Sequence, residues 1–323
     1  MRGDHVHPAR WYEVLMGDVV LELVGLGKRF GDRVAVANLD LTVRRGEIFG
    51  LLGPNGAGKT TTISTTCGVI PPSSGTARIA GHDIRTDTFA AKRAIGLVPQ
   101  DLALYDDLTA RQNLAFFGQL YGLGGAELHA RIEWALGIAQ LTDRSDEIIK
   151  KFSGGMKRRL NLVVGLIHQP TLLILDEPTV GVDPQSRRHI FDAIRALQGG
   201  GMTVVYTSHY IEEVEELCDR VAIMDAGRIV TSGTLAELTH AHGIALEVEL
   251  EGDEVAIAGA VAAVAGFDAT RDGRTLRFAQ RDTWAPVVSA IEASGARIKR
   301  LGSQRADLET VFLALTGRGL RDA

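Results

Sequence analysis

The sequence of 323 residues predicts an α/β fold with a mainly parallel core sheet, followed by a smaller α+β domain. Up to about residue 243, strand-like apolar runs alternate with helical patterns, which is typical of parallel sheets. From residue 244 the expected order is strand, helix, two strands, helix and strand, the βαββαβ pattern of a ferredoxin-like domain. We therefore expect an N-terminal extension over 1–18, a main domain over 19–243 and an accessory domain over 244–323.

The composition is that of a folded protein, with 45% hydrophobic and 23% charged residues. The net charge of -5 gives no global attraction to nucleic acid, so we expect no nucleic-acid partner. The two cysteines, Cys67 and Cys218, lie too far apart for a zinc motif, which favours a reducing cytosol. No run approaches the roughly 18 apolar residues that cross a bilayer. The first residues lack the apolar core of a signal peptide, and translation could start at Met1 or Met16.

Three strands are expected early in the chain, over 19–24, 39–43 and 48–52, because their apolar residues alternate or run together. The third strand leads into a glycine-rich loop, and a threonine-rich helix follows from Gly58. The region of about 101–170 is mainly helical in pattern. Asp107 or Thr109 is expected to cap its first helix, which runs through Phe117.

Two strongly apolar strands are expected next, over 172–175 and 203–207, with a helix between them. An acidic helix at 212–216 is expected to turn its glutamates to solvent. A hairpin should follow, its strands at 221–224 and 228–231. The last helix begins near Asp307, and its apolar residues fall on one face: Leu308, Val311, Phe312 and Leu315.

The loop at 53–60 fits the pattern G-x-x-x-x-G-K-[ST], which cradles phosphate groups. Glycines let the backbone curl so that its N–H groups point at phosphate oxygens, and the next helix adds its N-terminal partial charge. Lys59 would contact the β- and γ-phosphates, and the Thr60 hydroxyl would bind Mg²⁺. The expected ATP-binding residues here are Gly53, Pro54, Asn55, Gly56, Ala57, Gly58, Lys59, Thr60 and Thr61.

An apolar strand at 172–175 ends in two acids, Asp176 and Glu177. In a parallel sheet, ligands collect at the carboxyl ends of the strands. Asp176 is placed to hold Mg²⁺, and Glu177 to orient or deprotonate an attacking water. Taken alone, the pattern fits an exposed turn about equally well. The phosphate loop elsewhere in the chain favours the catalytic interpretation.

Further motifs make the chain resemble the ATPase subunits of ABC transporters over about 19–235. They occur in the family's order: an adenine-stacking aromatic at Phe30, a Q-loop glutamine at Gln100, a signature motif at 152–156, a D-loop at 181–184 and a switch histidine at His209. The resemblance implies a P-loop NTPase ABC cassette with an antiparallel β subdomain and a helical subdomain over about 101–170. Two positions depart from the usual residues, Phe152 for Leu and Phe30 for Tyr, and neither puts hydrolysis in doubt.

The resemblance also assigns roles to these residues. Phe30 would stack on adenine, Gln100 would contact Mg²⁺ or the γ-phosphate, and His209 would be catalytic with Glu177. The signature and D-loop residues would serve the ATP of a second subunit: Ser153, Gly154, Gly155 and Asp183. Two such chains would then sandwich two ATP molecules head to tail. We expect a homodimer, although the sequence does not show whether the second subunit is an identical copy. The three basic residues that follow the signature, at 157–159, are expected to be mainly solvated.

The segments at 177–184 and 307–312 resemble the ABC-2-type exporters of drugs, antibiotics or lipids. This implies ATP and Mg²⁺ as cofactors, a separate ABC-2-type membrane permease, and a place in the cytoplasm on the inner face of the membrane. The accessory domain would stabilise the dimer or regulate it, in preference to sensing a ligand. The cargo is not readable from the sequence.

Other functions fit less well. A soluble ABC ATPase acting on a ribosome or a nucleic-acid complex usually carries two cassettes or a long coiled coil. This chain has one phosphate loop, no heptad run and an acidic balance. A module that only holds ATP would need a damaged Glu177 or His209. An importer is disfavoured only by the resemblance of 177–184 and the tail.

Overall fold

The computed structural model describes residues 19–242, 244–267, 269–279, 283–302 and 308–316. It divides into two compact units, one up to Val230 and one from Thr231 onward. The domain boundary expected at 243/244 falls within the second unit. The expected N-terminal extension, 1–18, lies outside the described residues.

The first unit contains an antiparallel sheet in the order β2-β1-β4-β5. Its long strands are β1 (Val19–Phe30) and β2 (Arg33–Arg44), joined by β4 (Ser74–Ile79) and the short β5 (His82–Asp83). β1 and β2 run further than their apolar alternation indicates. Register shifts interrupt the β1–β2 ladder between Leu23 and Arg29, so the alternation fails while the pairing continues.

A six-stranded sheet forms the centre, in the order β10-β9-β3-β8-β7-β6. The strands are β3 (Ile48–Leu52), β6 (Ile95–Val98), β7 (Leu172–Asp176), β8 (Thr203–Ser208), β9 (Arg220–Asp225) and β10 (Arg228–Thr234). β3 pairs in parallel with both β8 and β9, which agrees with the mainly parallel core expected from the sequence. The turn between β9 and β10 has Ala226 and Gly227 at φ 45° and 77°, the backbone of a tight hairpin turn.

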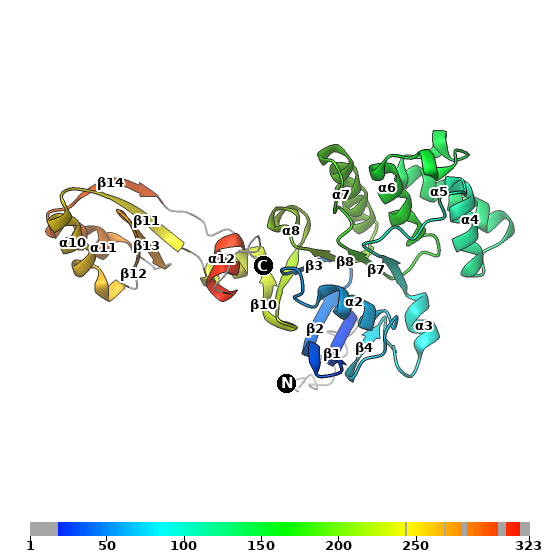
Figure 1. The fold of residues 1–323 in the computed structure, drawn as a ribbon, viewed down its shortest axis with the longest axis horizontal. Helices are drawn as coiled ribbons and strands as arrows, with labels where there is room; N and C mark the ends of the chain where they lie inside the picture. Colours follow the sequence, from blue (N-terminus) through cyan, green and yellow to red (C-terminus); the bar gives the residue numbers. More distant parts are fainter. Residues whose placement is uncertain (1–18, 243, 268, 280–282, 303–307, 317–323) are drawn as a thin grey trace, which may run out of the picture. The chain divides into compact units, whose positions relative to one another are not determined.

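Helix α2 (Lys59–Thr66) lies between the two sheets and joins their cores (Figure 1). Its Ile63 packs in one apolar cluster with Leu21 of β1 and Ile174 of β7. Two of its buried threonines, Thr62 and Thr65, donate their hydroxyls to carbonyls four residues earlier, at 2.9 and 2.7 Å. The other helices that accompany the sheets are α3 (Thr88–Arg93), α7 (Pro184–Gly199) and α8 (Ile211–Leu217).

Three helices form the expected helical region, α4 (Ala110–Leu120), α5 (Gly125–Ala139) and α6 (Gly154–Val164). They gather together at one side of the first unit (Figure 1). Thr109 caps α4 in a capping box, in which its hydroxyl accepts from the backbone of Gln112 and the Gln112 side chain accepts from Thr109. Of the two caps considered from the sequence, Thr109 is therefore correct.

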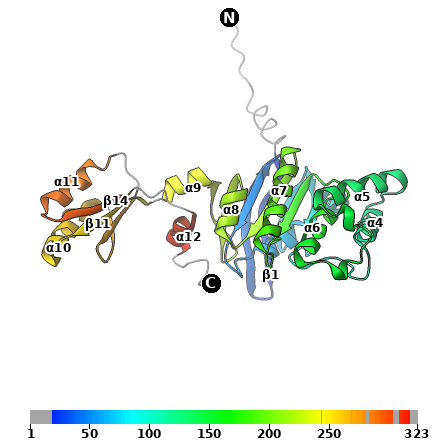
Figure 2. The same ribbon diagram turned by 90° about the horizontal axis from the view of Figure 1, so that it is seen from above.

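The second unit contains the βαββαβ pattern, in the sheet order β12-β13-β11-β14. Both α10 and α11 contribute to one core with alternate residues of β11, so they cover the same face of the sheet. The other face is polar, with Glu249 paired to Lys299 at 2.5 Å and Glu247 to Arg277 at 3.3 Å. The elements are β11 (Ile244–Glu251), α10 (Glu254–Ala263), β12 (Ala269–Asp272), β13 (Thr275–Ala279), α11 (Ala285–Ala293) and β14 (Arg297–Gly302) (Figure 2).

The last helix, α12 (Leu308–Thr316), packs against α9 (Leu235–His242). Leu308, Val311 and Phe312 are fully buried, which confirms the amphipathic pattern. Among the described residues, no helix combines the length and apolar character needed to span a membrane.

Candidate nucleotide-binding and hydrolysis site

A cleft of about 330 Å³ opens where the carboxyl ends of the parallel strands meet. The phosphate loop after β3, Gln100 after β6 and Glu177 after β7 all contribute to it. The lining residues are Arg33, Val34, Ala35, Pro54, Asn55, Gly56, Gly58, Lys59, Thr60, Thr61, Gln100, Glu177, Ala226 and Gly227. A larger cavity of about 760 Å³ lies at the opposite, amino ends of β7 and β8, away from the phosphate loop.

The phosphate loop has a backbone that only glycine permits. Gly58 has φ 105°, and a Cβ there would come within 2.6 Å of the Ala35 carbonyl oxygen. At Gly53, a Cβ would lie 2.3 Å from the Met224 carbonyl oxygen. The Lys59 ammonium is buried and donates to the carbonyls of Gly53 and Pro54, at 2.6 and 3.2 Å. A buried cation in a glycine loop at a helix start fits the phosphates of ATP.

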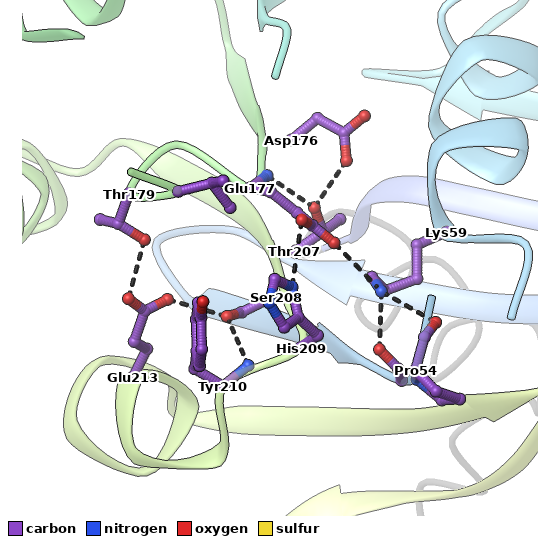
Figure 3. A network of polar contacts seen from close by, with 12 residues as sticks. Pro54, Lys59, Asp176, Glu177, Thr179, Thr207, Ser208, His209, Tyr210 and Glu213 are labelled. Carbon is purple, nitrogen blue, oxygen red and sulfur yellow. Dashed lines mark hydrogen bonds and ion pairs between the residues drawn. The ribbon is translucent and has the colours of Figure 1, made fainter. Parts of the chain in front are cut away.

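Glu177 lies between two of the other predicted residues (Figure 3). One carboxylate oxygen is 3.2 Å from Lys59 Nζ, and the other is 3.1 Å from His209 Nδ1. The side chain is almost fully buried, and its backbone has a positive φ of 46°, which is unusual outside glycine. The Glu177 N–H donates to Thr207 Oγ1 at 3.0 Å, which holds this turn in place. The structure therefore brings Lys59, Glu177 and His209 together.

Asp176 is the last residue of β7 and lies beside the cleft without lining it. Its Oδ1 accepts from Thr207 Oγ1 at 2.8 Å, and the Thr60 hydroxyl is near enough to lower the pKa of its carboxyl. Burial raises the pKa of the Asp176 carboxyl, and the Glu177 charge adds to this, against the hydrogen bonds and Lys59. Thr60, Asp176 and the cleft-lining Gln100 offer oxygen atoms, the ligand type that suits Mg²⁺. The described part of the chain has no cluster of three or more His, Cys, Asp or Glu that could hold a metal without substrate.

We expect Asp176→Asn to raise the unfolding temperature at neutral pH by a few degrees, measured without nucleotide. Because the folded state raises the pKa of Asp176, ionising this carboxyl costs folding stability as the pH rises above its ordinary value. The gain should disappear as the pH falls toward about 4. As a control, Asp183→Asn should give no such gain, since hydrogen bonds from Ser186 lower the pKa of Asp183. An Asp176→Asn protein that melts earlier at neutral pH would contradict this account.

The signature and D-loop residues lie together, outside the lining of this cleft. Ser153 caps α6 by accepting from the Met156 N–H at 3.3 Å. Asp183 caps α7 by accepting from the Ser186 N–H and hydroxyl, at 2.9 and 2.7 Å. Gly155 packs directly on Ser186. Ser153 and Gly154 are exposed, so the start of α6 is open to a group from outside.

The two signature glycines should respond differently to alanine. At Gly155 a Cβ would lie 2.0 Å from Ser186 Oγ, whereas at Gly154 nothing lies within 4 Å. We expect Gly155→Ala to cost about 1–3 kcal/mol in unfolding free energy, since Ser186 is held by Asp183 and cannot yield freely. Gly154→Ala should leave the stability unchanged or raise it slightly. Chemical denaturation of the two variants tests this, and equal stabilities would contradict it.

Some predicted residues do not line the cleft. Phe30 is half exposed at the end of β1, where Lys28 Nζ lies 5.1 Å from its ring centre, and the nearby lining comes from residues 33–35 instead. Its adenine role stays a prediction. Gly53 and Ala57 form the loop behind the lining, and His209 reaches the site through Glu177.

Sequence reasoning missed or misjudged several residues. Thr207 belongs to no motif, yet its hydroxyl bonds both the Asp176 carboxylate and the Glu177 backbone N–H. Glu213 was expected on a solvated face, and this is wrong: it is 3% exposed and bonds three hydroxyls. It lies four residues before the buried Leu217, so helical spacing could have placed it inward. The basic residues at 157–159 were expected to be mainly solvated. Arg158 instead donates to the backbone carbonyls of Gln100 and Val180.

Comparisons with known proteins relate this chain to ABC transporters. A family model described as ABC transporter matches residues 36–180. Linearmycin resistance ATP-binding protein LnrL of Bacillus subtilis (strain 168) is 43% identical over 311 residues, with 94% of this chain and 100% of that protein covered. Daunorubicin resistance ATP-binding protein DrrA3 of Streptomyces coeruleorubidus is 39% identical, covering 94% and 97%. Nod factor export ATP-binding protein I of Cupriavidus metallidurans is 40% identical, covering 94% and 99%.

A solved structure of an ATP-binding subunit of an ABC transporter superposes with a TM-score of 0.63 at 29% identity. It covers 69% of this chain and 92% of the solved one. CbiO1 from Clostridium perfringens, part of an ABC transporter complex, gives the same TM-score and identity.

A phosphate loop, a strand ending in two acids and a histidine on the second acid together define a P-loop ATPase cassette. The relatives that match nearly the whole chain identify the family within this class. The chain belongs to the ABC transporter family, as an ATP-hydrolysing subunit of the exporter group. The rival function on a ribosome or a nucleic-acid complex has no support among these relatives.

Proposed function

We propose that this chain energises the efflux of a drug, antibiotic or lipid-like molecule through a separate ABC-2-type permease. It would act in the cytoplasm, peripherally on the inner face of the cell membrane. Relatives named for linearmycin resistance, daunorubicin resistance and Nod factor export support this, because they match nearly the whole chain, second unit included. The observation that carries the ATPase part is the position of Glu177, between Lys59 and His209 in the cleft.

The catalytic roles follow from this geometry. Lys59 neutralises phosphate charge, and its contact with ATP draws it away from Glu177. The freed Glu177 carboxylate orients the attacking water and accepts its proton. His209 Nδ1, at 3.1 Å, fixes the Glu177 carboxylate in direction. Thr60, Asp176 and Gln100 would hold Mg²⁺, which when bound neutralises charge on the phosphate oxygens.

The signature residues would act on the ATP of a second copy. Ser153, Gly154, Gly155 and Asp183 lie outside the lining of their own chain's cleft, and the start of α6 is open. A helix N-terminus with free N–H groups favours a phosphate. Two chains arranged head to tail would bury two ATP molecules, and the accessory domain would stabilise or regulate this dimer.

Transmission to the permease would pass through the segment after Gln100. Tyr105 in this segment is half exposed and stacks edge-on against Phe116, with ring centres 4.8 Å apart. Arg158 ties the Gln100 carbonyl to that of Val180 near the D-loop, so the cleft and this surface share one support. We propose that the permease contacts this surface at Leu104, Tyr105, Asp106 and Leu108.

Deletion of the gene from its host tests the proposed export. The deleted strain should become more sensitive to some compounds in a panel of amphiphilic antibiotics and membrane-active lipids. The wild-type gene should restore resistance, and the Lys59→Ala gene should not. Unchanged sensitivity and unchanged intracellular accumulation across the panel would contradict the proposed export.

A further inference from the structure

Glu213 is a buried carboxylate that the motifs do not explain. It lies in α8, is 3% exposed and does not line the cleft. Three hydroxyls donate to it: Thr179 at 2.8 Å, Tyr206 at 2.9 Å and Ser208 at 2.8 Å. The Arg187 guanidinium lies 3.9 Å away. Burying a carboxylate is costly unless it is fully bonded, so this cluster is held tightly.

Two of the three hydroxyls, those of Thr179 and Ser208, come from the segments that lead to the reacting side chains (Figure 3), and the third, that of Tyr206, lies within β8. Thr179 lies two residues after Glu177, in the turn that leaves β7. Ser208 ends β8, immediately before His209, and its Oγ also accepts from the Tyr210 N–H at 2.9 Å. The backbone on both sides of His209 is therefore tied to the same carboxylate.

We propose that Glu213 is a positioning residue for ATP hydrolysis. It clamps the Glu177 loop to the His209 loop, so that the Glu177 carboxylate and His209 Nδ1 stay at 3.1 Å. A carboxylate suits this task because it only accepts hydrogen bonds and can receive all three hydroxyls. A glutamine would present an N–H₂ group to one of them. The inference rests on the roles proposed above for Glu177 and His209.

The first test is Glu213→Gln, measured by steady-state ATP hydrolysis of the purified full chain. The kcat should fall by about tenfold, the effect of losing one or two charged hydrogen bonds. The KM for ATP should stay nearly constant, since Glu213 does not line the cleft. Glu212→Gln, an exposed neighbour on the same helix, is the matched control. An unchanged kcat, or a loss confined to KM, would overturn the inference.

The second test separates positioning from general damage. The rate of single-turnover hydrolysis is measured with excess protein. Glu213→Gln should lower this rate in the wild-type background but lower it little further in the His209→Ala background, because Glu213 acts through His209. The same slowing in both backgrounds would overturn the inference. If Glu213→Gln does not fold, Ser208→Ala decides: its kcat should fall at constant KM, and an unchanged kcat would overturn it. A wild-type chain without ATPase activity would instead reject the proposed function.

Discussion

Glu177→Gln should reduce ATP turnover by at least about a hundredfold while ATP binding is kept. Glutamine has nearly the same volume and can still accept a hydrogen bond from His209, but it cannot take a proton from the attacking water. It also loses the ion pair with Lys59, which leaves Lys59 free for phosphate. The variant should therefore bind ATP at least as tightly as the wild type, as measured by calorimetry.

The same variant should accumulate as a dimer in ATP and Mg²⁺, since in the proposed head-to-tail dimer hydrolysis releases the two chains. Size-exclusion chromatography with light scattering measures this directly. Without ATP the variant should run as the wild type does. The double variant Glu177→Gln with Lys59→Ala should not dimerise, because it lacks the phosphate contact. A monomeric and fully active Glu177→Gln protein would contradict both the catalytic role of Glu177 and the proposed head-to-tail dimer.

Lys59→Ala should weaken ATP binding by about a hundredfold, or roughly 2.7 kcal/mol. Lys59 is a buried cation at the start of α2 that lines the cleft, and alanine removes the charge outright. Its loss also removes the cation that compensates the buried Glu177 carboxylate, so that the negative charge of Glu177 repels the phosphates more strongly.

Calorimetric titration with ATP and Mg²⁺ measures the loss. Lys150→Ala provides the matched control, because Lys150 is exposed in the helical region and only pairs with Asp107 at 3.8 Å. The control should bind ATP like the wild type. An unchanged affinity in Lys59→Ala would show that the phosphates bind elsewhere.

The site motifs could be predicted because their geometry is local. In the phosphate loop, glycines, lysine and threonine are covalent neighbours between a buried strand and a helix, so their spacing alone dictates a cradle. Asp176 is the last residue of β7, whose five residues are all buried, and Glu177 follows it, so both acids lie at the carboxyl end of this strand. The βαββαβ order of the second unit likewise shows in alternating apolar positions, which the core confirms.

The remaining features depend on contacts between distant segments. The cleft wall at 33–35 and the turn at 226–227 meet because the Ala37 N–H donates to the Gly227 carbonyl at 2.8 Å, across about 190 residues of chain. No local pattern announces this pairing. The sequence does not reveal that Gly155 packs against Ser186, which lies 31 residues further along the chain and leaves no room for a Cβ. Glu213 has three neighbouring glutamates that are exposed, so the charge of the segment predicts a solvated face. Only its position on the helix, on the same side as the buried Leu217, indicates that it is buried.

Co-purification tests whether this ATPase drives a separate membrane protein, as proposed. Tagged Glu177→Gln protein would be purified with ATP and Mg²⁺ from gently solubilised native membranes, and its companions identified by mass spectrometry. We expect a stoichiometric membrane protein with several spanning helices to be recovered. Recovery of a soluble assembly such as ribosomes, with no membrane partner, would contradict this proposal.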